Sequence, residues 1–195
     1  LAWADGLRDH VDEPGRERLE RIEQTCKHIS ELTTIARDFV ESIGDEAELD
    51  SSAVNLKHIL NSELDKASTR HEEATITVDG TVPSVSVRAN ELLSSVFGNL
   101  LNNAVRHNDS SDPRVEVGVT ESETGVRVRV ADNGPGIPDS RKSTVFGKGE
   151  LGPESPGTGI GLYLVYTLVD QYGGDVWIED NDPEGAVFVV ELPTY

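Results

Sequence analysis

The stretch from Glu91 to His107, ELLSSVFGNLLNNAVRH, constrains the fold more strongly than any other part of this 195-residue chain. Apolar residues recur at helical spacing throughout it and cover most of the circumference of the helix that they predict. They are Leu92, Leu93, Val96, Phe97, Leu100, Leu101, Ala104 and Val105. A helix that is apolar on nearly all sides is buried, so the stretch predicts a central helix covered by other elements.

Polar residues follow one face of that helix. Asn99, Asn103, Arg106 and His107 lie along a single stripe when successive residues turn by about 100°. Asparagine is a poor helix former, and a buried amide needs hydrogen-bond partners. The run by itself permits two interpretations: either the amides are satisfied in the core or at a wet edge of the helix, or the stripe faces a polar ligand.

Composition limits the class of protein. The formal net charge is −19 and the pI is near 4.5, which disfavours nucleic acid or an anionic membrane surface as partner. No apolar run approaches the roughly 20 residues that a membrane-spanning helix needs. The single cysteine, Cys26, fits a reducing compartment, so we expect a cytoplasmic location. The spread of carboxylates resembles the acidic surfaces of extreme halophiles; a moderately acidic mesophilic protein is the alternative.

Residues 1–44 predict a helical hairpin. A turn at Asp12-Glu13-Pro14-Gly15 precedes a long helix from Arg16 to about Ser42, whose apolar positions alternate at three and four residues. The seam comprises Leu19, Ile22, Cys26, Ile29, Thr33, Ala36, Val40 and Ile43. Two helices cannot bury such a face alone, so we expect a second copy to complete a four-helix bundle. Packing against the following domain is the alternative.

Residues 53–195 predict a second domain of α+β class, with one sheet covered on one face by helices. Alternating residues predict strands at 75–78, 85–87, 114–120, 125–131, 175–179 and 186–192. Residues 54–73 predict a short strand followed by a helix, and a second helical pattern appears at 159–172. Residues 137–157 show no periodicity and are rich in Gly and Pro. Because long loops in compact domains are usually functional or disordered, we interpret this segment as a lid.

Two glycine motifs bracket the lid. The pentapeptide DNGPG, residues 132–136, follows a strand, and its Asp132 carboxylate is suited to accept from an exocyclic amino group. An ordinary Asn-Gly turn with a solvated Asp is the alternative. The hexapeptide GTGIGL, residues 157–162, opens a helix whose backbone N–H groups form an anion site. It lacks the Lys-Ser/Thr of a phosphate loop and the spacing of a dinucleotide fingerprint.

Taken together, the two asparagines, DNGPG, the lid and GTGIGL resemble the ATP-binding domain of sensor histidine kinases in the GHKL superfamily. The resemblance covers Val54 to Tyr195, and residues 1–44 resemble the second half of that family's dimerisation and phosphotransfer hairpin. It implies a two-layer α/β sandwich, the Bergerat ATP-binding fold, with ATP between the central helix and the lid. It also implies Mg²⁺, a homodimer and a response-regulator receiver domain as partner.

The resemblance implies a role for each matching residue. Asn103 looks like the Mg²⁺ ligand, Asn99 occupies the preceding position of the same box, and Asp132 looks like the acceptor for the adenine amino group. The positions with implied catalytic roles are Asn99, Asn103, Arg106 and Lys148. The implied nucleotide-binding positions are Asn103, His107, Asp132, Gly134, Gly136, Ile137, Phe146, Gly157, Thr158, Gly159, Ile160, Gly161 and Leu162.

The match fails at the phosphoacceptor. The family's box of the form His-Glu/Asp-Leu-Arg-x-Pro is absent, and neither His10 nor His28 has suitable neighbours. We therefore expect the acceptor histidine to lie upstream of Leu1. Two other functions stay open: an ATP hydrolase of the same superfamily, and a nucleotide-binding dimeric switch without catalysis. Hydrolases place a glutamate base where Asn99 stands, and asparagine cannot accept that proton.

Overall fold

The computed structural model describes residues 52–122, 125–147 and 160–195, together with Gly15, Arg16, Leu19, Ile22 and Thr33. Contacts divide the chain into two compact units, Leu1–Glu41 and Ser42–Tyr195. Most of the predicted hairpin, residues 1–44, lies outside the described residues. Among those described, no helix is both long enough and apolar enough to cross a membrane.

The second unit contains two sheets. A five-stranded mixed sheet has the order β2-β4-β5-β7-β6, and a separate antiparallel pair joins β1 to β3. The strands are β1 Ser52–Asn55, β2 Thr75–Asp79, β3 Ser86–Ala89, β4 Arg114–Glu121, β5 Gly125–Asp132, β6 Asp175–Asp180 and β7 Ala186–Pro193. The helices are α3 Leu56–Arg70, α4 Leu93–Arg106, α5 Asp139–Lys142 and α6 Ile160–Gln171.

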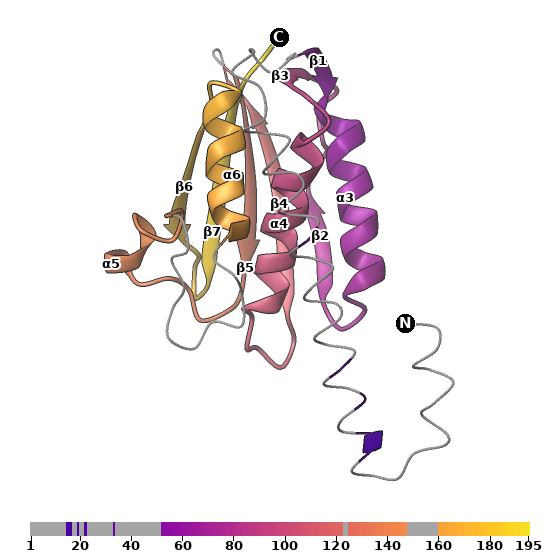
Figure 1. Cartoon of the computed structure of the whole chain (residues 1–195), viewed down its shortest axis with the longest axis vertical. Helices are drawn as coiled ribbons and strands as arrows, with labels where there is room; N and C mark the ends of the chain where they lie inside the picture. The colour runs from indigo at the N-terminus through magenta and orange to yellow at the C-terminus, as the bar shows by residue number, and fades with distance from the viewer. Residues whose placement is uncertain are drawn as a thin grey trace. The chain divides into compact units, whose positions relative to one another are not determined.

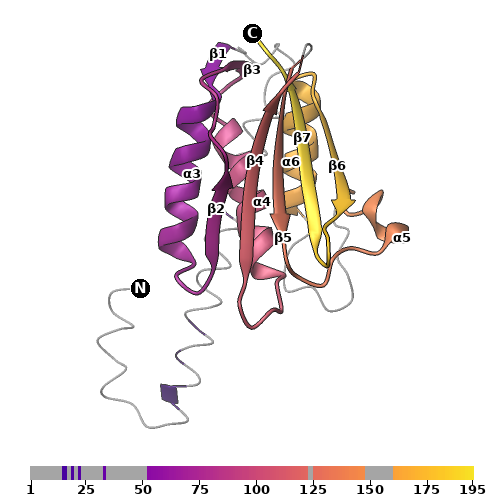
Figure 2. The ribbon, with the colours of Figure 1, turned by 180° about the vertical axis from the view of Figure 1, so that it is seen from behind.

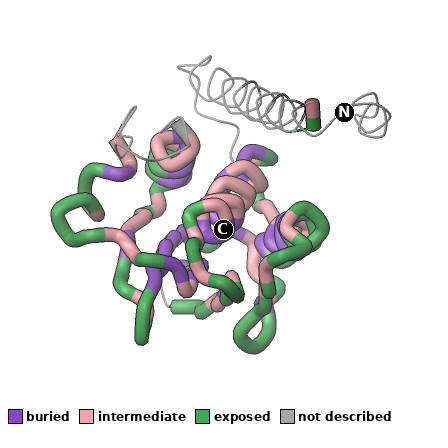
Figure 3. Tube along the Cα trace, turned by 90° about the horizontal axis from the view of Figure 1, so that it is seen from below, coloured by how far each residue is buried: buried purple, intermediate pink, exposed green. Residues whose placement is uncertain are grey.

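The elements form two layers. Helices α3, α4 and α6 lie side by side on one face of the large sheet, and the view from behind shows the other face without a helix over it (Figures 1 and 2). Buried residues lie where helices and strands face one another, and exposed residues lie mainly on the outer turns (Figure 3). The predicted two-layer α/β sandwich is confirmed.

Alternating side chains explain the sheet. In β5, Val126, Val128 and Val130 are fully buried, whereas Arg127 and Arg129 between them are exposed. Antiparallel register sets these valines against apolar residues of β4 and β7: Val130, for example, pairs with Val117 on one side and Phe188 on the other. The apolar set therefore faces the helices as a single surface.

The prediction of a single sheet was wrong. The strand expected near residues 85–87 pairs with β1 instead, in the register Val54–Val87, and an isolated bridge between Val87 and Thr194 connects it to the end of the large sheet. A short alternating run predicts a strand but does not identify the partner strand. The expectation that residues 137–157 contain no element was also wrong at Asp139–Lys142, which form α5.

Helix α4 is buried as predicted. The seven apolar residues between Leu93 and Val105 in its buried set are at most 6% exposed. Its start is fixed from outside the helix, because Asn90 Oδ1 accepts the N–H of Leu92 (3.0 Å) and the hydroxyl of Tyr172. Tyr172 follows α6 and is 2% exposed, and this burial raises the pKa of its hydroxyl well above the usual range. The hydroxyl therefore remains a donor that ties α6 to the start of α4.

We predict that Tyr172→Phe lowers the free energy of unfolding by about 1 kcal/mol, because one buried hydrogen bond is lost while Asn90 keeps its bond to Leu92. Tyr166→Phe is the matched control. Tyr166 is 46% exposed on α6, so its hydroxyl is expected to contribute less than about 0.5 kcal/mol. Urea denaturation measures both variants, and equal stabilities would contradict the assigned role of Tyr172.

Candidate functional site

The elements that carry the described site residues come together at one end of the second unit. The C-terminal ends of β5 and α4, the start of α6 and the turn between β6 and β7 all lie there (Figure 1). Segments far apart in sequence therefore meet at the lower end of the sheet in this view.

Asp132 ends β5 and is only 8% exposed. Its Oδ1 accepts two backbone N–H groups, from Gly134 at 2.9 Å and from Ala186 at 3.3 Å. No hydrogen bond joins its other oxygen, Oδ2, to another described residue. Burial raises the pKa of Asp132, and the two N–H donors offset part of that rise. The result is a carboxyl group whose orientation is fixed through one oxygen while the second remains available.

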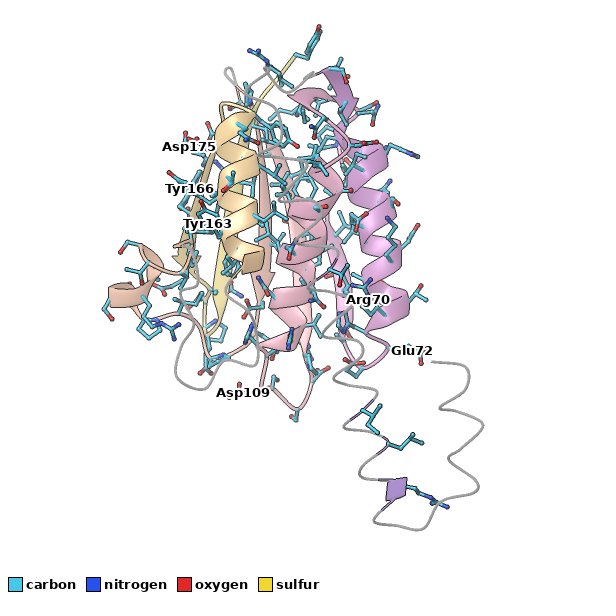
Figure 4. All side chains as sticks on the ribbon, viewed as in Figure 1. Arg70, Glu72, Asp109, Tyr163, Tyr166 and Asp175 are labelled. Atoms are coloured by element: carbon cyan, nitrogen blue, oxygen red, sulfur yellow. The ribbon has the colours of Figure 1, made fainter. Side chains whose placement is uncertain are left out.

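Asn133 is a structural residue. Its Oδ1 accepts the backbone N–H of Arg114 at 2.7 Å and the amide of Asn108 at 2.9 Å, and its Nδ2 donates to the carbonyl of Asp112 at 3.0 Å. These bonds join the end of β5 to the loop after α4, in which Figure 4 labels Asp109. The DNGPG segment is therefore a turn stabilised by Asn133, with Asp132 buried beneath it. Asp132 is buried, unlike the solvated aspartate of an ordinary Asn-Gly turn.

Two glycines of DNGPG lie against backbone. A Cβ added at Gly134 would lie 3.1 Å from Asp132 Oδ1 and 3.2 Å from Asn108 Cα. Gly136 has a φ of +71°, and a Cβ there would lie 3.0 Å from the carbonyl oxygen of Gly185. Side chains at either position would strain this wall of the site.

The asparagines of α4 differ in their surroundings. Asn99 Nδ2 donates to the carbonyl of Ser95 at 2.8 Å, and a Cβ added to Gly161 of α6 would lie only 2.6 Å from Asn99 Oδ1. Asn103, one turn further, is half-buried, and its side chain makes no hydrogen bond to another described residue. Asn99 therefore contacts α6, whereas the amide of Asn103 remains available to a ligand.

The stripe ends at Arg106, which is half-buried, and at His107, the residue that caps α4. Partial burial lowers the pKa of His107, and the positive charges of Arg106 and Arg141 lower it further. Its imidazole is therefore neutral near pH 7. Arg106 supplies the fixed positive charge at this end of the stripe.

The described start of the predicted lid, residues 137–147, is attached to the sheet. Lys142 Nζ lies 2.7 Å from carboxylate oxygens of both Asp139 and Asp180, and Asp180 ends β6. The ring of Phe146 lies with its centroid 6.4 Å from that of Tyr166 on α6 and 6.5 Å from that of Phe188 on β7 (Figure 4 labels Tyr166). Phe146 is thus part of an aromatic cluster that joins the lid to α6 and β7.

The structure does not describe all of the predicted site residues. Lys148, Gly157, Thr158 and Gly159 lie outside the described residues, so their assignments stay predictions. Ile137 and Leu162 are half-buried beside the site elements, and Ile160 begins α6.

The sequence analysis did not identify Asn181, Gly185 and Ala186, which contact Asp132, or Lys142, which attaches α5 to β6. The sequence signal at this place was Gly185, the glycine at the end of the turn after β6.

These features define an α/β sandwich whose candidate site lies at the end of the central strand of the sheet. A family model described as "Histidine kinase-, DNA gyrase B-, and HSP90-like ATPase" matches residues 88–195. The chain belongs to this family.

Among curated proteins, the chain is 36% identical over 105 residues to sensor histidine kinase DpiB of Escherichia coli K12, covering 51% of this chain and 19% of that protein. It is 32% identical to the adaptive-response sensory kinase SasA of Synechocystis, covering 68% and 36%. It is 30% identical to the kinase/phosphatase MprB of Mycolicibacterium paratuberculosis, covering 92% and 36%. The chain thus spans between about a fifth and somewhat over a third of the length of these relatives.

Solved structures agree in fold. A mycobacterial sensor histidine kinase MprB structure has a TM-score of 0.67 at 25% identity and covers 74% of this chain and 97% of its own. Histidine kinase ThkA in complex with response regulator protein TrrA has a TM-score of 0.74 at 22% identity, covering 100% and 56%. Full-length ShkA in complex with AMPPNP has a TM-score of 0.70 at 24% identity, covering 100% and 42%.

We predict that Gly161→Ala destabilises the fold by about 0.5–1.5 kcal/mol, because the new Cβ displaces Asn99 Oδ1 and forces that side chain away from its rotamer. Removing the collision in Asn99→Ala/Gly161→Ala reverses the sign: alanine then gains up to about 1 kcal/mol over glycine in a helix. Gly118→Ala is the control, since a Cβ there meets nothing within 4 Å. Urea denaturation of the single and double variants measures the coupling, and additive effects would exclude the contact as the reason for Gly161.

Proposed function

We propose that this chain is the ATP-binding catalytic part of a histidine kinase in a two-component signalling system. The γ-phosphoryl group of ATP would pass to a histidine and then to an aspartate of a response-regulator receiver domain. The proposal rests on the carboxyl group of Asp132, which is buried, fixed through Oδ1 and available through Oδ2. This carboxyl group lies at the same end of the domain as the C-terminal end of α4, which carries the asparagine stripe. The names of the relatives and of the AMPPNP and response-regulator complexes support it.

Hydrogen-bond complementarity indicates where the adenine base of ATP binds. Oδ2 of Asp132 accepts from the exocyclic amino group of the base, as carboxylates accept from base amines. Gly134 and Gly136 let the base approach the backbone closely. The neutral ring of His107 lies at the adjoining end of α4, beside the position where the nucleoside leaves the base pocket.

The phosphate end depends on α4 and α6. The start of α6 presents the positive end of the helix dipole, which favours a phosphate. Arg106 adds a fixed positive charge, and Lys148 is proposed to add another from the lid. In a chain of net charge −19 these local groups offset a field that otherwise repels a nucleotide.

Mg²⁺ fits Asn103. Its amide oxygen is a hard ligand, and Mg²⁺ commonly completes its shell with phosphate oxygens and waters. No group of three or more His, Cys, Asp or Glu side chains able to hold a metal occurs among the described residues. When bound, the ion supplies neutralisation of phosphate charge.

Phosphoryl transfer needs positioning and charge neutralisation rather than a protein nucleophile on this domain. Asn99 argues against hydrolysis, because an amide engaged with Ser95 cannot accept a proton from water.

We further propose that residues 1–44 dimerise. Ile22, a residue of the predicted seam, is 57% exposed in the single chain. From the single cysteine and the net charge of −19 we also propose a cytoplasmic location and adaptation to high salt.

We predict that Asp132→Asn lowers the affinity for Mg-ATP about 10- to 100-fold, since a charge-assisted bond contributes roughly 1.5–3 kcal/mol. The asparagine oxygen can still accept from Gly134 and Ala186, so its NH₂ replaces Oδ2 and faces the base. A 6-oxo purine triphosphate then fits better than ATP. Titration calorimetry in molar KCl measures both nucleotides, and unchanged affinity for ATP would exclude the assignment.

The stability of Asp132→Asn provides the control for folding. Because the folded-state pKa of Asp132 lies above the unfolded value of 3.8, ionisation of this carboxyl destabilises the fold, an effect that grows as the pH rises through the folded-state pKa. The neutral amide should therefore be at least as stable as wild type at pH 7. The difference should vanish below the unfolded-state pKa, where the carboxyl is protonated in both states.

We predict that a version carrying further residues before Leu1 transfers label from γ-³²P-ATP to a histidine and then to a receiver domain. Asn103→Ala should abolish transfer. Asn102→Ala is the matched control, because Asn102 lies on the side of α4 that faces α3, with Oδ1 3.0 Å from Nε2 of His71, the residue after α3. Release of free phosphate without labelled protein would favour the hydrolase. Nucleotide binding with neither product would favour the switch.

A further inference from the structure

The turn between β6 and β7, residues 181–185, lies directly against Asp132. Asn181 Nδ2 donates to the backbone carbonyl of Asp132 at 2.8 Å, and the N–H of Ala186 donates to Asp132 Oδ1 at 3.3 Å. The N–H of Asn181 in turn donates to the carbonyl of Gly185 at 3.1 Å, which closes the turn. Both the main chain and the side chain of Asp132 are therefore bonded from one hairpin.

These bonds replace a regular step of the sheet ladder. Pairing of β5 with β7 ends at Ala131 and Val187. At the next step the N–H of Ala186 bonds the side chain of Asp132, and the carbonyl of Asp132 receives the amide of Asn181 instead. A buried carbonyl without a donor would be costly, so the Asn181 amide is what allows Ala186 to hold Oδ1.

The backbone of the turn leaves no room at Gly185. Its φ is +121°, and an added Cβ would lie 1.9 Å from the carbonyl oxygen of Asp132. The carbonyl of Gly185 in turn contacts Gly136, where an added Cβ would lie 3.0 Å from it. The turn is thus packed between Asp132 and Gly136.

The residue before Asn181 has a different partner. Asp180 accepts from Lys142 Nζ at 2.7 Å, and the Lys142 side chain is 17% exposed. This ion pair joins the end of β6 to α5, which follows the DNGPG segment in the chain. Two adjacent residues of one hairpin, Asp180 and Asn181, therefore contact α5 and the end of β5 respectively.

We propose that Asn181 is a positioning residue that orients Asp132 toward the 6-amino group of the purine, whereas the Lys142–Asp180 pair attaches α5 to the end of β6. The inference rests on the proposed function and assigns to the β6–β7 turn a role in base specificity. Loss of the Asn181 amide releases the carbonyl of Asp132 and lets the carboxyl reorient, which weakens recognition of the amino group alone. Loss of the Lys142–Asp180 pair leaves Asn181 and Asp132 in contact, so it does not distinguish one purine from another.

The test compares Mg-ATP with the Mg²⁺ complex of purine riboside triphosphate, which lacks the 6-amino group. Affinities are measured by titration calorimetry in molar KCl for the full chain. For Asn181→Ala we expect about a tenfold loss of ATP affinity, the equivalent of one hydrogen bond, with purine riboside triphosphate affinity unchanged within about twofold. Asn181→Ser, which keeps a donor, should retain part of the preference for ATP. Lys142→Met should change both affinities by the same factor.

Glu184→Gln is the control within the same turn, since Glu184 is exposed and should change neither affinity by more than about twofold. Thermal unfolding of each variant shows that the fold is retained. An equal loss for both nucleotides in Asn181→Ala, or no loss for either, overturns the inference while leaving the proposed function intact. Absence of binding of either nucleotide to wild type overturns the proposed function itself.

Discussion

The close packing of α4 between α3 and α6, over the buried face of the large sheet, is the constraint on which the site depends. Adjacent residues of α4 face the two neighbours: a Cβ at Gly98 would lie 3.1 Å from Glu63 Oε2 of α3, and Asn99 lies against Gly161 of α6. Glycine within a helix costs up to about 1 kcal/mol relative to alanine. That cost is the consequence of bringing three helices near enough to place the ends of α4 and α6 together.

The charged groups around Asp132 have different partners within this acidic chain. Lys142 bonds Asp139 and Asp180, and these contacts raise its pKa. Partial desolvation and the positive charges of Arg106 and Arg141 lower the pKa of His107, so its imidazole is neutral near pH 7. Under the proposed function, the start of α6, Arg106, Lys148 and a metal ion would serve the phosphates, and one carboxyl oxygen of Asp132 would serve the base.

The sequence predicts those parts of the fold that repeat with a clear period. The apolar spacing from Leu92 to Val105 predicts the buried helix, and the alternating valines of β4 and β5 predict their shared buried face. It does not predict that β3 leaves the large sheet for β1, because strand patterns carry no information about pairing partners. Asn181 escaped notice for a related reason. Its importance comes from the carbonyl it reaches, 49 residues earlier in the chain, and not from any local pattern.

The hairpin that joins β6 to β7 has a consequence for how this domain can diverge. Tips of hairpins are usually the places where chains gain and lose residues without harm. Here the spacing between Asp180 and Gly185 is set by partners on both sides, Lys142 in one direction and Asp132 in the other. A single inserted residue would break one of these contacts, so the tip should keep a constant length even where its exposed side chains vary freely.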